Sequence, residues 1–432
     1  MKTLLFERNP ARFAASRVVS AFGSGRGAGI GPLRLVEGQA PALPAPGWQH
    51  VDPILSGICG SDLATLDARS SRYFEDLVSF PFVPGHEVVG TVATPARAAD
   101  GTDLPPGSRV VVEPVLGCRA RGLDPVCDEC AQGRTGSCRM VAFGHLRPGL
   151  QTGFCADTGG GWSTAGLVAH ESQLHAVPPG LDDRDAVTVE PVACAVHAVM
   201  SAALRGGETV VVVGAGTLGL ASVAALSHLA RAGHVAEPTD VLVGARYPHQ
   251  RTWAAELGAT DVLAPEHVSR AVRRRTRSMA VGAPSGGGQR LTGGADVVLD
   301  CVGTAASIGQ ALDLVRPRGR VVLVGMAGRV HLDLASLWHR EVTLVGAYAY
   351  GTELSRRTAA PISTFSLAFD VVAATGTGRL VTATYPLERF EEAVAHAGSA
   401  GRRGAVKIAF DLKQPPHKAP PPASAPRKEG PK

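Results

Sequence analysis

Apolar residues change their pattern along the chain near residue 186. Beyond that point, near-continuous runs of Val and Leu alternate with segments whose apolar residues recur at helical spacing. A helix is expected over 218–233, and strands are expected over 208–214, 241–245, 295–303, 320–326 and 342–348. Buried strands that alternate with helices are typical of a parallel sheet covered on both faces. The pattern therefore predicts a doubly wound α/β domain in the second half of the chain.

The first 185 residues are instead rich in Gly and Pro, with short β-type runs at 87–92 and 109–115. This texture predicts an irregular, mostly β domain with long loops. The glycine-rich stretch at 23–32 follows no clear strand, and Pro32 occupies the position where a helix would have to begin. We therefore expect a flexible loop there and not a phosphate-binding turn.

Mixed helix and strand return over 352–413 and end in a strand-like run at 405–412. The segment that follows, 414–432, is rich in Pro, Ala and charged residues, which predicts a disordered tail. The arginine cluster at 271–277 is expected on a solvated helix or loop.

The composition limits which class of protein this is and which kinds of partner it is expected to bind. The net charge is only +5 and aromatic residues make up 5%, so no nucleic-acid surface is expected. No segment approaches the roughly 18 uninterrupted apolar residues of a membrane span, and residues 1–13 do not resemble a secretory signal. We therefore expect a cytoplasmic protein, in which a Cys-x2-Cys pair favours metal binding or catalysis over a disulfide.

A glycine motif, Gly214-Ala215-Gly216-Thr217-Leu218-Gly219, directly follows an expected strand and opens an expected helix. In this context the first glycine makes a tight turn, Gly216 lets a pyrophosphate approach the backbone, and Gly219 allows close packing of helix and strand. The helix N-terminus would face the phosphates. The motif predicts a dinucleotide site.

The end of the next strand bears on the choice between NAD and NADP. An NAD site places an acidic residue there to accept a hydrogen bond from the ribose 2′-hydroxyl. Here Gly244 and Ala245 occupy that position, and Arg246 follows. This favours NADP over NAD, with a merely solvated Arg246 as the alternative.

Candidate metal ligands occur in the first half and at the transition. Cys59, His86 and Glu190 offer a thiolate, an imidazole and a carboxylate, which suit an open zinc site with three protein ligands. Each residue also has an ordinary interpretation, as a small buried hydrophobe, a satisfied loop histidine and a helix N-terminal acid.

With these residues and the nucleotide motif together, the sequence resembles those of the zinc-dependent medium-chain alcohol and polyol dehydrogenases. The resemblance runs from about residue 30 to 412. It rests on GICGSD (57–62), PGHEVVG (84–90), the cysteine-rich segment 127–138, EPVACAVHA (190–198), GAGTLG (214–219) and DCVG (300–303).

The resemblance implies a GroES-like irregular β catalytic domain followed by a Rossmann domain with a doubly wound parallel sheet. The implied organisation is a catalytic domain at 1–187, a Rossmann domain at 188–350, a return to the catalytic domain at 351–413 and a tail at 414–432. Cofactor contacts are expected at Gly214, Gly216, Thr217, Leu218, Gly219, Arg246, Val302 and Val324.

The resemblance also implies roles at the catalytic zinc. Cys59 and His86 match ligands, and the third ligand is either Glu87 or Glu190. Ser61 matches the hydroxyl that relays the alcohol proton. Asp62 matches an acid that orients the histidine. His197, also in a family motif, is interpreted as structural.

Three cysteines, Cys127, Cys130 and Cys138, are spaced Cys-x2-Cys-x7-Cys, whereas the resemblance implies a structural zinc held by four. Asp124 stands where the first cysteine of the family pattern should be. Cys118, nine positions before Cys127, reaches the metal if the intervening residues form a loop insertion. We expect Cys118 as the fourth ligand, with Asp124 as its rival. The other thiols are expected in the core or in loops, namely Cys155, Cys194 and Cys301.

The implied activity is hydride transfer between an alcohol or polyol, or the matching aldehyde or ketone, and NAD(P). The alternatives are a zinc-free quinone or enone reductase and a non-catalytic nucleotide-binding protein of the same superfamily. The resemblance further implies a homo-oligomer, either a dimer or a tetramer.

Overall fold

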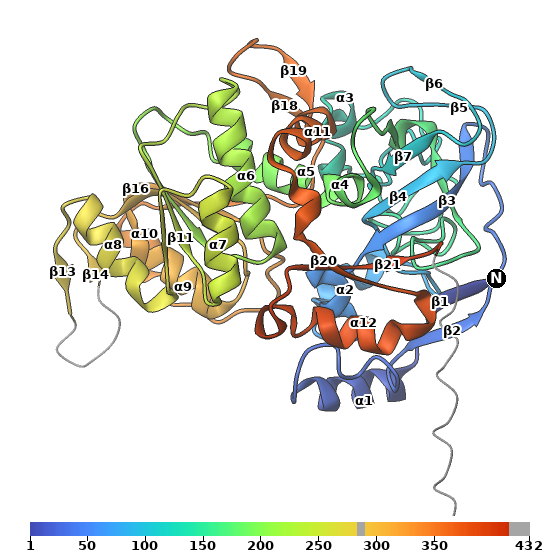
Figure 1. Ribbon diagram of the computed structural model, residues 1–432, viewed down its shortest axis with the longest axis horizontal. Helices are drawn as coiled ribbons and strands as arrows, with labels where there is room; N and C mark the ends of the chain where they lie inside the picture. Colours follow the sequence, from blue (N-terminus) through green and yellow to red (C-terminus); the bar gives the residue numbers. More distant parts are fainter. Residues whose placement is uncertain (283–289, 414–432) are drawn as a thin grey trace, which may run out of the picture.

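The computed structural model describes residues 1–282 and 290–413, so the tail expected at 414–432 lies outside the described residues. Two large sheets organise the chain (Figure 1). The first is parallel throughout, in the order β12-β11-β10-β15-β16-β17. Its strands are β10 (Thr209–Val213), β11 (Asp240–Gly244), β12 (Asp261–Leu263), β15 (Ala295–Asp300), β16 (Val315–Leu323) and β17 (Thr343–Gly346). The strands expected in the second half of the chain are thus confirmed.

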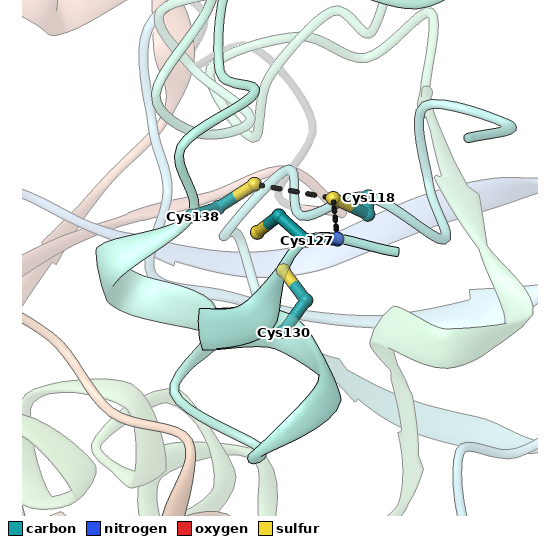
Figure 2. A group of neighbouring side chains, drawn as sticks. All are labelled: Cys118, Cys127, Cys130 and Cys138. Atoms are coloured by element: carbon teal, nitrogen blue, oxygen red, sulfur yellow. Dashed lines mark hydrogen bonds between the residues drawn. The ribbon is translucent and has the colours of Figure 1, made fainter. Parts of the chain in front are cut away.

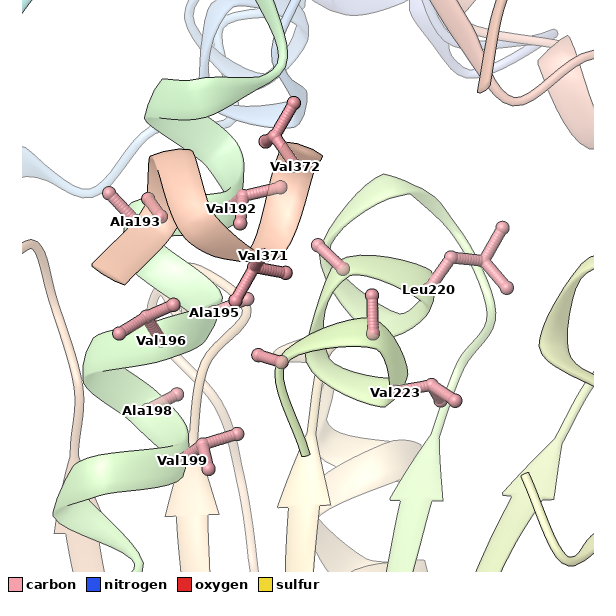
Figure 3. Close-up of a cluster of buried hydrophobic side chains, with 14 of the residues drawn as sticks. Val192, Ala193, Ala195, Val196, Ala198, Val199, Leu220, Val223, Val371 and Val372 are labelled. Carbon is pink, nitrogen blue, oxygen red and sulfur yellow. The ribbon is translucent and has the colours of Figure 1, made fainter. Parts of the chain in front are cut away.

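Helices cover both faces of this sheet, because both sets of side chains along its strands are apolar. Val210 and Val212 of β10 belong to a core shared with several helices, and Val211 and Val213 belong to the core on the opposite face. The first core packs against α5 (Val189–Ser201), α6 (Thr217–Arg231), α7 (Pro248–Glu256) and α11 (Thr364–Thr375). Figure 3 shows α5, α6 and α11 interlocking through valine, leucine and alanine side chains. The opposite face is covered by α8 (Val268–Arg275), α9 (Ala305–Leu314) and α10 (Ala335–His339).

The second sheet combines segments from both ends of the chain. Its order is β20-β21-β3-β4-β7-β9, with β8 also paired to β3. The strands are β3 (Trp48–Gly57), β4 (Val88–Val92), β7 (Arg109–Val112), β8 (Leu167–His170), β9 (Leu174–Ala176), β20 (Val381–Tyr385) and β21 (Lys407–Asp411). Because β21 pairs antiparallel with β3, the end of the described chain lies beside the strand that leads into the expected catalytic residues.

An N-terminal hairpin-like unit is the part of the fold that the sequence pattern did not predict. β1 (Lys2–Phe6) pairs antiparallel with β2 (Leu33–Glu37), and α1 (Pro10–Ser20) lies between them in sequence. The helix begins as Asn-Pro sequences often do, since Asn9 accepts a hydrogen bond from the Arg12 N–H at 3.1 Å and proline occupies the first helical position.

The glycine-rich stretch after α1 is a loop, and its glycines allow close packing. Gly25 has φ +78°, and a side chain there would overlap the Val394 carbonyl of α12 (Phe390–Ala397). This stretch therefore joins α1 to α12 through direct backbone contact.

The remaining elements are short. They are α2 (Gly60–Leu66), α3 (Asp128–Ala131), α4 (Asp183–Val187), β5 (Ala96–Arg97), β6 (Asp103–Leu104), β13 (Ala280–Val281), β14 (Arg290–Leu291), β18 (Thr352–Leu354) and β19 (Pro361–Ser363). The expected solvated arginine cluster lies mainly on α8, where Arg275 pairs with Asp240 at 2.9 Å. No helix in the described ranges is both long and apolar enough to pass through a membrane.

Candidate active site and metal centres

A deep cleft between the two sheets contains most of the expected site residues. Its volume is about 1760 Å³. The parallel sheet contributes the loops that follow β10, β15 and β16, and the second sheet contributes the turn between β3 and α2 and the segment before β4. The expected residues that line the cleft are Cys59, Ser61, His86, Glu87, Glu190, Gly216, Thr217, Leu218, Val302 and Val324.

Three of these residues form a compact set of metal donors. Cys59 immediately precedes α2, while His86 and Glu87 immediately precede β4. Their ligand atoms all lie within 4.8 Å of one another, and both the imidazole and the carboxylate are buried. One sulfur, one nitrogen and one oxygen donor at the edge of a cleft fit a zinc ion that keeps a position open for substrate.

Asp62 connects two of these donors from behind. Its Oδ2 accepts a hydrogen bond from the Cys59 backbone N–H at 2.9 Å, and its Oδ1 lies 3.4 Å from Nδ1 of His86. Burial lowers the pKa of His86, but the charges and hydrogen bonds of Asp62 and Cys59 raise it above its usual value. Asp62 therefore lies where it can orient the imidazole, as the resemblance implied.

Lys407 is a site residue that the sequence analysis missed. It forms a buried ion pair with Glu87, and its Nζ also donates a hydrogen bond to the Ile58 carbonyl at 3.1 Å. Burial lowers the pKa of Lys407, and the Glu87 carboxylate outweighs this effect and raises it. A lysine within the apolar strand sequence AVKIAF was the available signal, because a buried lysine needs a partner.

Glu190 lies nearby but outside the compact donor set. It accepts hydrogen bonds from the Tyr350 hydroxyl at 3.0 Å and the Cys194 thiol at 3.6 Å. Burial raises the pKa of Glu190 to about 7. Tyr350 was not predicted, and Cys194 lines the cleft beside Glu190, so its interpretation as a mere core or loop thiol was incomplete.

Two other residues from the sequence motifs, Ser61 and His197, differ in their position relative to the cleft. Ser61 lies in the first turn of α2 and lines the cleft beside Cys59. His197 faces away from the site, because its Nδ1 lies 2.7 Å from the Glu353 carboxylate. This contact supports the structural interpretation of His197.

The nucleotide motif adopts a tight turn between β10 and α6. Gly214 has φ +90°, which favours glycine, and a side chain at Gly219 would overlap the Gly214 carbonyl. Nothing lies within 4 Å of a Cβ placed at Gly216, so the helix N-terminus is open to a phosphate. Asp300 shapes the neighbouring loop by accepting hydrogen bonds from Val302 N at 3.0 Å and Gly303 N at 3.3 Å.

Arg246 is separate from this arrangement. It is exposed at the end of β11, and it is not among the described residues that line the cleft. Ala245 and Arg246 follow β11, and neither is acidic.

The second donor set consists of four cysteines (Figure 2). The Sγ atoms of Cys118, Cys127, Cys130 and Cys138 lie within 4.8 Å of one another. Cys118 and Cys138 are 3.6 Å apart, and Cys118 accepts a hydrogen bond from the Cys127 N–H at 3.3 Å. Asp124 is exposed and is not part of this set.

A buried arginine organises the chain after Cys118. Arg121 is fully buried and donates hydrogen bonds to main-chain carbonyls of Leu116, Phe143, Leu146, Arg147 and Gly149. Because these carbonyls come from both sides of the cysteine-rich segment, Arg121 holds the loop insertion in a shape that brings Cys118 to the other three thiols. Four thiolates in a closed set fit a structural zinc.

Comparison with known proteins identifies the family. The model of the alcohol dehydrogenase GroES-like domain matches residues 45–179, and the model of the zinc-binding dehydrogenase matches residues 229–366. Together the matches cover more than half of the chain and include both donor sets. The chain belongs to the zinc-dependent medium-chain dehydrogenases.

Curated relatives agree with this placement. A 2-dehydro-3-deoxy-L-galactonate 5-dehydrogenase of Pseudoalteromonas atlantica is 28% identical over 74% of this chain and 80% of its own length. A probable D-xylulose reductase A of Aspergillus clavatus is 29% identical over 75% of this chain and 81% of its own.

Solved structures share the fold. The alcohol dehydrogenase of Thermus sp. ATN1 has a TM-score of 0.64 at 25% identity, covering 95% of this chain and 99% of its own. A dehydrogenase of Sinorhizobium meliloti bound to NADP has a TM-score of 0.63 at 25% identity, covering 88% and 95%. The protein is therefore a zinc-dependent oxidoreductase that acts on small-molecule alcohols with a nicotinamide cofactor. The comparisons do not support the two alternatives, a zinc-free reductase and a non-catalytic nucleotide-binding protein.

Proposed function

We propose that the cleft is the active site for hydride transfer between an alcohol and NADP, with Cys59, His86 and Glu87 as zinc ligands. The observation that carries this proposal is their clustering within 4.8 Å in the same cleft that the nucleotide turn lines. Glu87 is favoured over Glu190 as the third ligand because it belongs to the compact set, whereas Glu190 accepts hydrogen bonds from Tyr350 and Cys194.

A zinc ion held there supplies Lewis acidity, which lowers the pKa of an alcohol. Proton transfer and the orientation of the ligands depend on residues of the chain. Ser61 accepts the hydroxyl proton of the substrate and passes it toward solvent, while Asp62 keeps His86 oriented. Val302 and Val324 line the cleft and would contact a bound nicotinamide, which would supply the hydride acceptor for the alcohol carbon. In reverse, the same groups serve reduction of an aldehyde or ketone.

The four cysteines are proposed as the structural zinc site, and free thiolates of this kind fit the reducing cytoplasm. NADP is preferred over NAD in this proposal. The support is the lack of an acidic residue at Gly244 and Ala245, together with an exposed Arg246 that can approach a 2′-phosphate.

A homo-oligomer is also proposed, formed through the edge of the parallel sheet at β17, which pairs only with β16 among the described residues. β17 is the last strand in the order, and Leu344 on this strand is exposed. Close by in sequence, Trp338 is 80% exposed and Leu334 is 53% exposed. An unpaired strand edge with exposed apolar side chains is a surface that a second copy would cover.

Zinc content and turnover of matched variants test the central assignment. Native protein is expected to hold about two zinc ions per chain, and Cys59→Ala about one, with its alcohol oxidation lost. Cys118→Ser is the matched variant, because it removes a thiol of the other set. One zinc in the native protein, unchanged by Cys59→Ala, would refute the catalytic site.

A further inference from the structure

The side of the cleft opposite the nucleotide turn is built largely from phenylalanine. The chain contains only 12 phenylalanines, and half of them line this one cavity. We call these six rings the phenylalanine wall: Phe6, Phe13, Phe74, Phe80, Phe82 and Phe154. They come from β1, α1, the segment before β4 and the segment after the cysteine-rich segment 127–138. The fold therefore gathers residues that are distant in sequence onto one surface.

Five of the six rings, all except Phe74, form a connected series that starts at the proposed metal site. The ring of Phe154 lies 5.9 Å from the His86 ring and 5.3 Å from that of Phe82. Phe82 stacks on Phe6 at 4.9 Å, and Phe6 meets Phe13 edge-on at 5.5 Å. Phe6 and Phe82 are buried and support the wall, while Phe13 and Phe154 remain partly exposed to the cleft.

The outer ring, Phe13, lies on α1, outside the residues that the two family models match. Both family matches begin after α1, the first of them at residue 45. α1 therefore brings an apolar ring to the cleft that holds the proposed metal ligands and the nucleotide turn. A ring at the outer part of the wall is a candidate determinant of substrate specificity.

α1 is held firmly against the helix that begins at the metal site. Asp67, which ends α2, is fully buried and accepts hydrogen bonds from Ser20 Oγ at 2.7 Å, Ser24 Oγ at 2.6 Å and Gly25 N at 2.9 Å. Ser16 Oγ donates to the Leu66 carbonyl. Since α2 carries Ser61 in its first turn, these bonds fix the position of α1, and with it Phe13, relative to the reacting atoms.

The rings themselves offer no hydrogen-bonding groups. Polar residues line other parts of the same cleft, among them Arg8, Arg72, Glu75 and Gln151. The Thr65 hydroxyl donates to the Ser61 carbonyl at 3.0 Å and lies 3.0 Å from the Ser70 hydroxyl. The hydroxyls of a polyol that lie directly against the rings would lose water without gaining partners there, which is unfavourable. An aryl or alkyl group would instead bury apolar surface against rings, which is favourable.

We propose that the substrate is an alcohol, or the matching carbonyl compound, that carries an aryl or bulky alkyl group, and that Phe13 and Phe154 determine this preference. The inference rests on the proposed function, since the hydroxyl must reach the metal site for the apolar group to lie along the wall. It departs from the sugar and polyol substrates in the names of the relatives.

Steady-state kinetics of the zinc-loaded enzyme test it. We expect kcat/KM for 1-phenylethanol and 4-phenyl-2-butanol to exceed that for ribitol, xylitol and sorbitol by about 100-fold or more. Phe13→Ala should lower kcat/KM for the aryl alcohols about tenfold while leaving 2-propanol within about twofold, and Phe154→Ala, which removes the ring beside His86, should also lower kcat/KM for the aryl alcohols. Phe22→Ala is the matched control, because Phe22 follows α1 yet is 75% exposed and lies outside the cleft lining. Polyols used as well as the aryl alcohols, or equal losses for 2-propanol, would overturn the proposal.

A binding measurement separates this inference from the proposed function. Thermal unfolding of the zinc-loaded enzyme without NADP reports binding where no turnover occurs. 1-Phenylethanol should raise the unfolding temperature of native and Phe22→Ala enzyme equally and that of Phe13→Ala by less, and ribitol should raise none. If no alcohol is oxidised with either cofactor, the proposed function is wrong. If ribitol protects the native enzyme as well as 1-phenylethanol does, the apolar substrate is wrong.

Discussion

Lys407 and Glu87 form an ion pair that is almost completely excluded from solvent, one residue away from the His86 imidazole. The pair joins β21, the last strand in the described sequence, to the segment that immediately precedes β4. Gly57 makes room for it, because a side chain at this position would overlap the Glu87 carboxylate. An ion pair so placed means that any metal bound by Glu87 shares this carboxylate with a fixed ammonium group.

Substitution Lys407→Met should destabilise the zinc-free protein by about 3–5 kcal/mol, because it leaves Glu87 as an unpaired buried charge. Urea unfolding of zinc-free samples measures this loss. The double variant Lys407→Met/Glu87→Gln removes both charges and should recover most of it. Equal stability of the single and double variants would contradict the charge argument.

Substitution Cys118→Ser should lower the zinc content by about one ion per chain, because three thiolates leave the four-cysteine site incomplete. Asp124→Asn is the matched change, since Asp124 is exposed and outside the donor set, and it should keep the native zinc content. Elemental analysis with parallel urea unfolding gives both quantities. The reverse ranking would make Asp124 the fourth ligand.

Glu190 should make the stability of the zinc-free protein depend on pH. Its pKa is raised to about 7 by burial, above the usual value of 4.5, so the folded state keeps a proton that the unfolded chain releases. The free energy of unfolding should therefore fall as pH rises from about 5 to 7 and level off above that. Glu190→Gln should remove this component, and Glu266→Gln, at an exposed position, should not. Urea unfolding at several pH values gives the slopes.

Substitution Arg246→Asp should move cofactor preference from NADPH toward NADH, because it replaces a partner for the 2′-phosphate with an acceptor for the 2′-hydroxyl. We expect the ratio of the two dissociation constants to change about tenfold or more, as a charge-assisted hydrogen bond is lost. Fluorescence titration of each reduced cofactor measures it. An unchanged ratio would mean that Arg246 is only solvated.

The parts of the molecule that were predictable depend on signals close together in sequence. The β10 strand, the Gly214–Gly219 turn and α6 form one continuous segment, and apolar periodicity with glycine placement is enough to predict it. The gathering of Cys118 with the other thiols was also expected, because the family resemblance implied a zinc site with four cysteines and Cys118 stands nine positions before Cys127. Nothing in the spacing, however, shows that Arg121 would close the insertion by binding five carbonyls.

The residues that were missed have partners far away in the sequence. Lys407 meets Glu87, and Tyr350 meets Glu190, only after the chain has folded through the whole parallel sheet. α1 was missed for a different reason. Its mean apolar character is low, and what holds it is a set of serine hydroxyls on the buried Asp67, a contact that periodicity does not report.

The pairing of β21 with β3 has a consequence for biosynthesis. Synthesis of the chain reaches β21 only after the whole parallel sheet has been made, so β3 must leave the ribosome long before its neighbour exists. During that interval β3 has an open edge and Glu87 has no lysine. The metal-binding half of the enzyme therefore completes its folding last, although most of it is translated first.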